Sequence, residues 1–151
     1  MHASAFLKFE TEFERVVKFS AAKAKEGSGV VLILLDCEDD CPATLGPKIA
    51  AEATSVRSDI DYVVCLAYRE FETWFMFAAA SLAGKCGLPA DLLPPSNPES
   101  HRDAKGWFGH QMTNGYLETE HQVALTALFD LQSALKSKSF KRLVDRLRPH
   151  L

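Results

Sequence analysis

The sequence predicts an α/β fold, a small parallel β-sheet whose two strands are joined by a crossover helix and flanked by helices. Residues 30–35 are an unbroken apolar run, and residues 60–68 are apolar apart from Asp61. Both have the length of strands that are buried on both faces. A helical pattern separates the two runs, and the order strand–helix–strand is typical of parallel pairing. Beyond the second run the patterns are helical, so we expect the C-terminal half to be mostly helical.

Length and composition predict one folded domain. The chain has 151 residues, of which 47% are hydrophobic and 25% are charged, and this balance is ordinary for a globular protein. We expect a single domain over residues 1–151, with the α/β core in 1–84 and a proline-rich loop followed by helices in 85–151. No apolar run has the length of a membrane span and no signal-peptide pattern is present, so we expect a cytoplasmic protein.

Periodicity and helix-breaking residues predict the elements of the first half. Apolar residues recur at helical spacing over 5–25, and the glycine-rich turn at 27–29 ends this helix. Pro42 and Pro47 suit the first turn of a helix that continues to about Val56.

The second half is predicted from the same signals. Apolar helical spacing resumes after the second strand, and proline and glycine mark the loops and turns. A serine before an apolar helical face predicts a helix cap. The expected elements are a helix through Trp74 to Leu82, a loop over 85–100, a short helix within 99–112, a turn at 113–116, a helix over 117–135, and a last helix capped by Ser139.

Basic residues gather near the C-terminal end of the sequence. Residues 136–151 contain six lysines and arginines and a single acid, Asp145. We interpret this segment as the solvated face of a helix whose cations complement the helix dipole. A nucleic-acid contact is the alternative, although one helix is a small footprint for phosphate binding.

Two strands make a small sheet, because most sheets have about four to six. Another chain completes this sheet, the fold has lost its first strand, or a further strand of the chain does not show in these patterns. The first possibility predicts a homo-oligomer.

Acidic residues lie where the two predicted strands end. Asp36 ends the first strand, Glu38 follows it, and Glu70 follows the second strand. The carboxyl ends of parallel strands meet at one edge of a sheet, where α/β proteins bind ligands. Carboxylate oxygens suit Mg²⁺, with Mn²⁺ as a substitute. We therefore predict a metal site of Asp36, Glu38 and Glu70, with Arg69 facing a phosphate.

A structural role competes with metal binding for these acids. Asp39 and Asp40 precede a helix that begins at Pro42, where acids favour the positive end of the helix or form the turn before it. We interpret them as cap or turn residues and keep them as secondary metal candidates. For Asp36 and Glu70 both interpretations remain open.

Asp103 and Lys105 follow the long proline-rich loop. Loops of this length in compact domains are often functional, so both are candidates for binding a phosphate or another ligand, with Lys105 as the group that could bind an anion. The alternative is the start of a surface helix.

Four stretches of the sequence, in order, resemble one protein family. LLDCEDDCPATLGP, AYREFETWF, RDAKGW and HQVALTALFDL resemble the bacterial domain-of-unknown-function family 4276, over residues 30–147. That family is similar to a divergent Toprim-like α/β domain, and Toprim domains hold Mg²⁺ for phosphoryl chemistry in topoisomerases, primases and nucleases. The resemblance also implies an AAA-type ATPase partner, because genes of the family often lie beside such ATPase genes.

The resemblance implies roles for the matched residues. Asp36-x-Glu38 takes the position of the Asp-x-Asp metal pair of Toprim domains, with Glu in place of the second Asp. The other matches are the acids before the tryptophan of the family and its Asp-Ala-Lys-Gly motif, namely Glu70, Glu72, Asp103 and Lys105.

One expected motif is missing from the sequence. The resemblance implies an earlier strand that carries the general acid/base in a Glu-Gly-x-x-Glu-like motif, and residues 1–28 do not contain it. Two hypotheses follow. The chain is an Mg²⁺-dependent, Toprim-like phosphoesterase or nuclease-like domain, or it is a non-catalytic binding or adaptor module. The missing motif favours the second for this chain alone.

Overall fold

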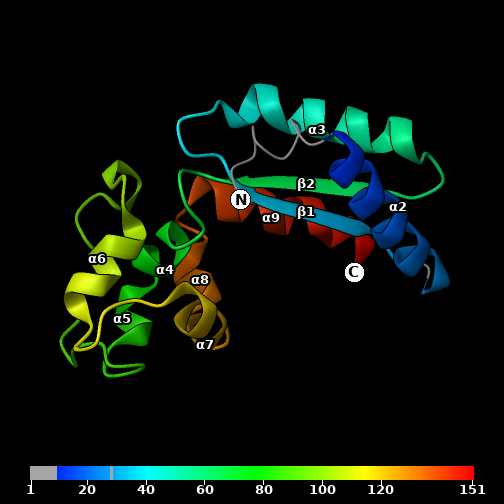
Figure 1. Ribbon diagram of the computed structural model, residues 1–151. Helices are drawn as coiled ribbons and strands as arrows, with labels where there is room; N and C mark the ends of the chain where they lie inside the picture. The colour runs from blue at the N-terminus through cyan, green and yellow to red at the C-terminus, as the bar shows by residue number, and fades with distance from the viewer. Residues whose placement is uncertain (1–9, 28) are drawn as a thin grey trace. The chain divides into compact units, whose positions relative to one another are not determined.

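The structure, a computed structural model, describes residues 10–27 and 29–151 (Figure 1). The chain divides into two compact units. The first comprises the described residues up to Tyr68 together with Arg142–Leu151, and the second is Arg69–Lys141. These units divide the chain after Tyr68 and after Lys141, not near residue 84. The expectation of a single domain over residues 1–151 stays a prediction.

A parallel pair of strands forms the centre of the first unit. β1 (Val31–Asp36) and β2 (Tyr62–Ala67) pair in a register that runs from Val31 opposite Tyr62 to Asp36 opposite Ala67. Helix α3 (Pro42–Val56) connects them, which confirms the predicted β-α-β order and the α/β class. Over the described residues the sheet has two strands.

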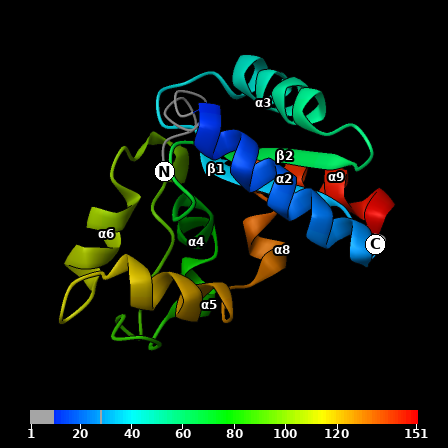
Figure 2. The same ribbon diagram turned by 45° about the vertical axis from the view of Figure 1, so that its right-hand side comes forward.

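Helices cover both sides of this pair. Helix α2 (Glu10–Glu26) precedes β1 and confirms the predicted first helix from residue 10 onward, whereas residues 5–9 and Ser28 lie outside the described residues. Phe13 and Val17 from α2 join Ile49 from α3 in one core with Ile33 and Val64 from the strands. Figures 1 and 2 show α3 and α9 (Lys138–Leu147) on opposite sides of β2.

Helix α3 begins where the sequence predicts, and one of its prolines does not lie where predicted. Pro42 takes the first helical position, where its missing N–H leaves nothing unpaired. Pro47 lies inside the helix and not in its first turn, because the helix has already begun at Pro42. The helix tolerates it and continues to Val56.

The second unit is helical, as predicted, and its helices are short. None of the described helices in either unit is long and apolar enough to cross a membrane. The elements of the second unit are α4 (Thr73–Phe77), α5 (Ala79–Leu82), the 3₁₀ turn η1 (Pro98–Ser100), α6 (Ala104–Gln111), the π-helical turn η2 (Glu118–Gln122), α7 (Val123–Thr126), α8 (Leu131–Ala134) and the first turn of α9.

Two predicted helices are interrupted. The helix expected through Trp74 to Leu82 breaks at Ala78 into α4 and α5. The helix expected over 117–135 is divided into η2, α7 and α8. The carboxylate of Asp130 accepts the Ser133 amide at 2.8 Å and starts α8. Asp and Ser three residues apart carry this signal in the sequence.

The cap of the last helix also differs from the prediction. Helix α9 begins at Lys138, so Ser139 lies inside it. The hydroxyl of Ser137 takes the capping position and accepts the Phe140 amide at 3.4 Å. Ser139 instead accepts a hydrogen bond from the indole N–H of Trp74 at 2.8 Å.

Candidate functional site

The end of β1 carries two of the predicted metal ligands. Asp36 is the last residue of the strand, and the exposed Glu38 follows two residues later with φ of 49°. Arg69 has φ of 62° two residues after the end of β2. Left-handed backbone is uncommon for residues with a side chain, and such conformations gather at functional sites.

The neighbouring acids Asp39 and Asp40 belong to a turn. The amide of Asp40 donates to the carbonyl oxygen of Cys37 at 2.8 Å. Helix α3 has Cys41 as its N-cap residue, and no side chain hydrogen-bonds to close the cap. The cap or turn interpretation of Asp39 and Asp40 is therefore confirmed as a turn, and the N-cap position itself belongs to Cys41.

Two acids of the second unit hold the start of α6. The oxygens of Glu70 accept the backbone amides of Ala104 at 3.2 Å and Lys105 at 3.3 Å. Asp103 is the N-cap residue, and its carboxylate accepts the Gly106 amide at 2.7 Å. Burial raises the pKa of Glu70, and the two amide hydrogen bonds oppose that shift. These carboxylates bind amides that a helix start leaves without partners.

The predicted cations of the second unit have internal partners as well. Lys105 Nζ lies 2.7 Å from a carboxylate oxygen of Glu118 and lowers the pKa of that acid through the hydrogen bond. Arg69 Nε donates to the carbonyl oxygen of Glu99 at 3.1 Å. Both side chains therefore have positions fixed by contacts within the unit.

Glu72 is the most buried of the predicted site residues, with 0% of its surface exposed. Its Oε1 accepts the Tyr116 hydroxyl at 2.8 Å and the Gln122 amide at 3.1 Å. Within the described part of the chain, Oε2 and the hydroxyl of Thr73 have no hydrogen-bond partner. Burial, followed by the nearby Glu72 carboxylate, raises the pKa of Tyr116 above its ordinary value.

The predicted metal ligands divide between the two units. Asp36 and Glu38 belong to the first, and Glu70 belongs to the second, where its oxygens bind helix amides. Among the residues that the structure describes, no group of three or more His, Cys, Asp or Glu is arranged to hold a metal ion. The Mg²⁺ site thus stays a prediction.

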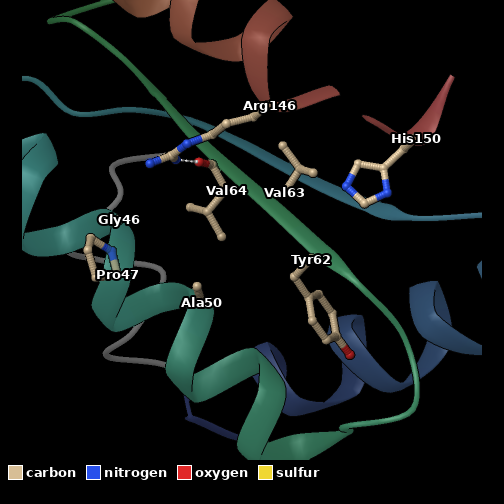
Figure 3. A pocket seen from close by; sticks show the side chains of 8 residues that line it. All are labelled: Gly46, Pro47, Ala50, Tyr62, Val63, Val64, Arg146 and His150. Atoms are coloured by element: carbon tan, nitrogen blue, oxygen red, sulfur yellow. Dashed lines mark hydrogen bonds between the residues drawn. The ribbon is translucent and has the colours of Figure 1, made fainter. Parts of the chain in front are cut away.

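Sequence reasoning missed a pocket beside β2. It has a volume of about 310 Å³ and is seen from close by in Figure 3. Helix α3 forms one wall, and Arg146 lies across the strand from it, where the guanidinium donates to the carbonyl oxygen of Val64. The only sequence signal was the basic character of residues 136–151. The lining residues are Gly46, Pro47, Ala50, Tyr62, Val63, Val64, Arg146 and His150.

A second pocket, of about 280 Å³, lies within the second unit. Cys86, with φ of 50°, and His121 are among its lining residues. The Nδ1 atom of His121 accepts the Leu117 amide at 2.8 Å, and its ring stacks on Tyr116 at 5.6 Å between centroids. The imidazole is therefore held against the wall of the pocket.

Comparisons with known proteins give no match for this chain. No family model matches it, and neither a curated protein nor a solved structure does. The resemblance to the domain-of-unknown-function family stays an expectation.

Proposed function

We propose that this chain is a non-catalytic binding or adaptor module, built on a Toprim-like α/β fold. The observation that carries this proposal is that the predicted site residues of the second unit form contacts within that unit. Glu70 and Asp103 bind amides of α6, Lys105 pairs with Glu118, and Glu72 is fully buried. A group that transfers a proton must instead reach the substrate.

Breaking these contacts so that the same carboxylates could bind a substrate would destabilise the second unit. A side-chain cap at a helix start stabilises a protein by about 0.5–2 kcal/mol. Turning Glu70 toward a substrate would leave two amides of α6 without their acceptors. Because these amides are part-buried, the rearrangement would carry the cost of unsatisfied donors, about 1–3 kcal/mol each.

The proposed partners are proteins. The resemblance implies an AAA-type ATPase, and the two-stranded sheet supports contact with a further strand, either from such a partner or from a second copy in a homo-oligomer. Nucleic acid has less support, because the basic residues lie on one C-terminal segment, which is a small footprint for phosphate binding.

The experiment that tests this proposal is a hydrolysis assay with millimolar Mg²⁺ or Mn²⁺. Plasmid, oligonucleotide and phosphate monoester substrates are incubated with the wild-type chain and with Asp36→Ala. We expect the same background rate for both proteins. Metal-dependent cleavage that Asp36→Ala abolishes, and that the turn variant Asp40→Ala retains, would overturn the proposal.

A second candidate function is Mg²⁺-dependent phosphoryl transfer at the end of β1. The observation in its favour is the position of Asp36 at the carboxyl edge of the sheet, followed by Glu38 in a left-handed conformation. Mg²⁺ is often bound by only one or two carboxylates, with water as its other ligands. A bound cation there would polarise a phosphate.

Thermal melting separates the two candidates. A ligand that binds only the folded state raises the midpoint by mass action. The second candidate requires that millimolar Mg²⁺ raise the midpoint of the wild type and not that of Asp36→Ala. An unchanged midpoint in both proteins removes its support.

A further inference from the structure

The outer edge of β2 carries backbone groups that β1 does not use. The amide of Val31 donates to Asp61 O at 2.9 Å, and the amide of Cys37 donates to Ala67 O at 3.0 Å. Odd-numbered residues around β2 therefore direct their backbone groups toward β1. Because these groups alternate along a strand, Tyr62, Val64 and Leu66 direct theirs to the other edge.

Arg146 lies at this outer edge. Its guanidinium donates one hydrogen bond to Val64 O, as Figure 3 shows, and a guanidinium has five N–H donors. In the part of the chain that the structure describes, no carboxylate forms an ion pair with it. The contact with Val64 fixes the position of the group and leaves its other donors for a ligand.

The remaining walls of the pocket are small and uncharged. Gly46, Pro47 and Ala50 of α3 face the strand edge, and among the described residues no acidic side chain lines the pocket. Arg146 and His150 supply its polar side chains on the other side, with the hydroxyl of Tyr62 already donating to Arg57 O at 3.0 Å. The pocket thus combines the outer edge of β2 at Tyr62 and Val64 with positive charge.

We propose that the outer edge of β2 binds an extended peptide segment that carries a carboxylate. The segment lies along this edge in an extended conformation, with its backbone pairing to Tyr62. Its carboxylate accepts hydrogen bonds from Arg146, and His150 lies at the same mouth of the pocket. This inference rests on the proposed binding function and names the chemistry of the partner.

The charge at the edge favours an acidic partner over a second copy of this chain. Two β2 strands related by a twofold axis near Val64 would bring two Arg146 side chains together. Like charges at such close range destabilise a strand pair. An acidic segment removes this repulsion and forms a charge-assisted hydrogen bond in its place.

The test uses the full chain labelled with ¹⁵N and a designed peptide as the probe. The peptide is the capped sequence Ser-Thr-Val-Thr-Glu-Thr-Val-Thr-Ser, and its control carries Gln in place of Glu. We expect shifts and slower hydrogen exchange at the amides of Tyr62 and Val64. The Glu peptide should bind roughly tenfold more tightly, the effect of one charge-assisted hydrogen bond.

Variants of the protein test whether Arg146 causes the preference for the Glu peptide over the Gln peptide. Arg146→Gln should abolish the tenfold preference for Glu, whereas Arg146→Lys should keep part of it because the charge remains. Arg148→Gln is the matched control, since Arg148 is a nearby cation that does not line the pocket. An unchanged amide spectrum away from β2 shows that each variant is folded.

Several results would overturn the inference. These are no shifts at millimolar peptide, shifts confined to other residues, or equal affinity for the two peptides. Protection of the β2 edge amides that grows with protein concentration, without peptide, would identify a second copy as the occupant. None of these results bears on the hydrolysis assay, so failure here is distinct from failure of the proposed function.

Discussion

The hydroxyl of Tyr116 donates a 2.8 Å hydrogen bond to Glu72, a carboxyl group with no exposed surface and 44 residues away in sequence. Gln122 donates to the same oxygen at 3.1 Å. The contacts join the start of α4 to the segment that follows α6. A buried carboxyl group needs such donors, because removing it from water is otherwise unfavourable.

Replacing Tyr116 with Phe should destabilise the second unit by about 1–3 kcal/mol, since the buried carboxyl group loses a donor and the ring is retained. Both tryptophans of the chain, Trp74 and Trp107, lie in this unit. Urea denaturation followed by tryptophan fluorescence therefore measures the change.

The matched control for this prediction is Tyr62→Phe, in the first unit. Its hydroxyl donates to a part-buried backbone carbonyl, that of Arg57. Circular dichroism should show a smaller loss, of about 1 kcal/mol. Equal losses for both variants would contradict the role given to Glu72.

Gly106→Ala should fail to stabilise α6, although alanine normally favours a helix over glycine by about 1 kcal/mol. A Cβ at this position would lie 2.0 Å from Oδ2 of Asp103, so it would displace the carboxylate that caps the helix. After Asp103→Ala has removed the cap, adding Gly106→Ala should stabilise the protein by about 1 kcal/mol. A double-mutant cycle measured by urea denaturation gives both values.

Gly109→Ala is the control within the same helix. Its Cβ would meet the amide nitrogen of Tyr116 at 3.6 Å, an ordinary contact. It should stabilise the protein by about 0.5–1 kcal/mol in either background. If Gly106→Ala behaves in the same way as Gly109→Ala in the parent chain, the cap at Asp103 does not contribute.

Ser139→Ala should destabilise the second unit by about 1–3 kcal/mol. Its hydroxyl accepts the indole N–H of Trp74, and both side chains are buried, so the variant leaves a donor without an acceptor. Ser133→Ala, at an exposed site, is a comparison for the loss of a hydroxyl. Tryptophan fluorescence should show the change in the surroundings of Trp74, and an unchanged midpoint would contradict the prediction.

Cys41 should be the most readily alkylated thiol at neutral pH. It is exposed, and the Thr44 side chain, followed by the amides of Thr44 and Ala43, lowers its pKa. Since the thiolate is the nucleophile, a lowered pKa shifts the rise of its rate to lower pH than for a free thiol. Burial raises the pKa of Cys65 to about 11, so this residue should stay unmodified.

Iodoacetamide labelling with peptide mass spectrometry, repeated from pH 6 to pH 9, tests this order of reactivity. Cys41→Ser should remove the fast reaction. In Thr44→Val the rise of the rate should move to higher pH, because the leading cause of the lowered pKa is lost. Faster labelling at Cys65 than at Cys41 would contradict the prediction.

Local patterns in the sequence predicted most of the first unit. Pro42 marked the start of α3, and the helix ends at Val56 as expected. The apolar runs gave both strands to within two residues, because a parallel strand buried on two faces needs continuous aliphatic side chains. These signals depend on neighbouring residues alone.

The site could not be predicted in the same way. Glu70 binds the start of α6 from 34 residues away, and nothing in the local sequence of either segment indicates that pairing. The acids at the strand ends predicted a metal site. The sequence could not decide between this role and a structural one, because carboxylates bind both metal ions and helix amides. Only the fold of the second unit shows which amides Glu70 and Asp103 bind.

The division of the chain has a consequence for its synthesis on the ribosome. The second unit is contiguous over Arg69–Lys141, whereas the first needs Arg142–Leu151, including the Arg146 contact with β2, to be complete. Translation therefore finishes every residue of the helical unit before it supplies the last segment of the α/β unit. Both strands are synthesised earlier, and Arg146 cannot contact the outer edge of β2 until the C-terminal residues leave the exit tunnel.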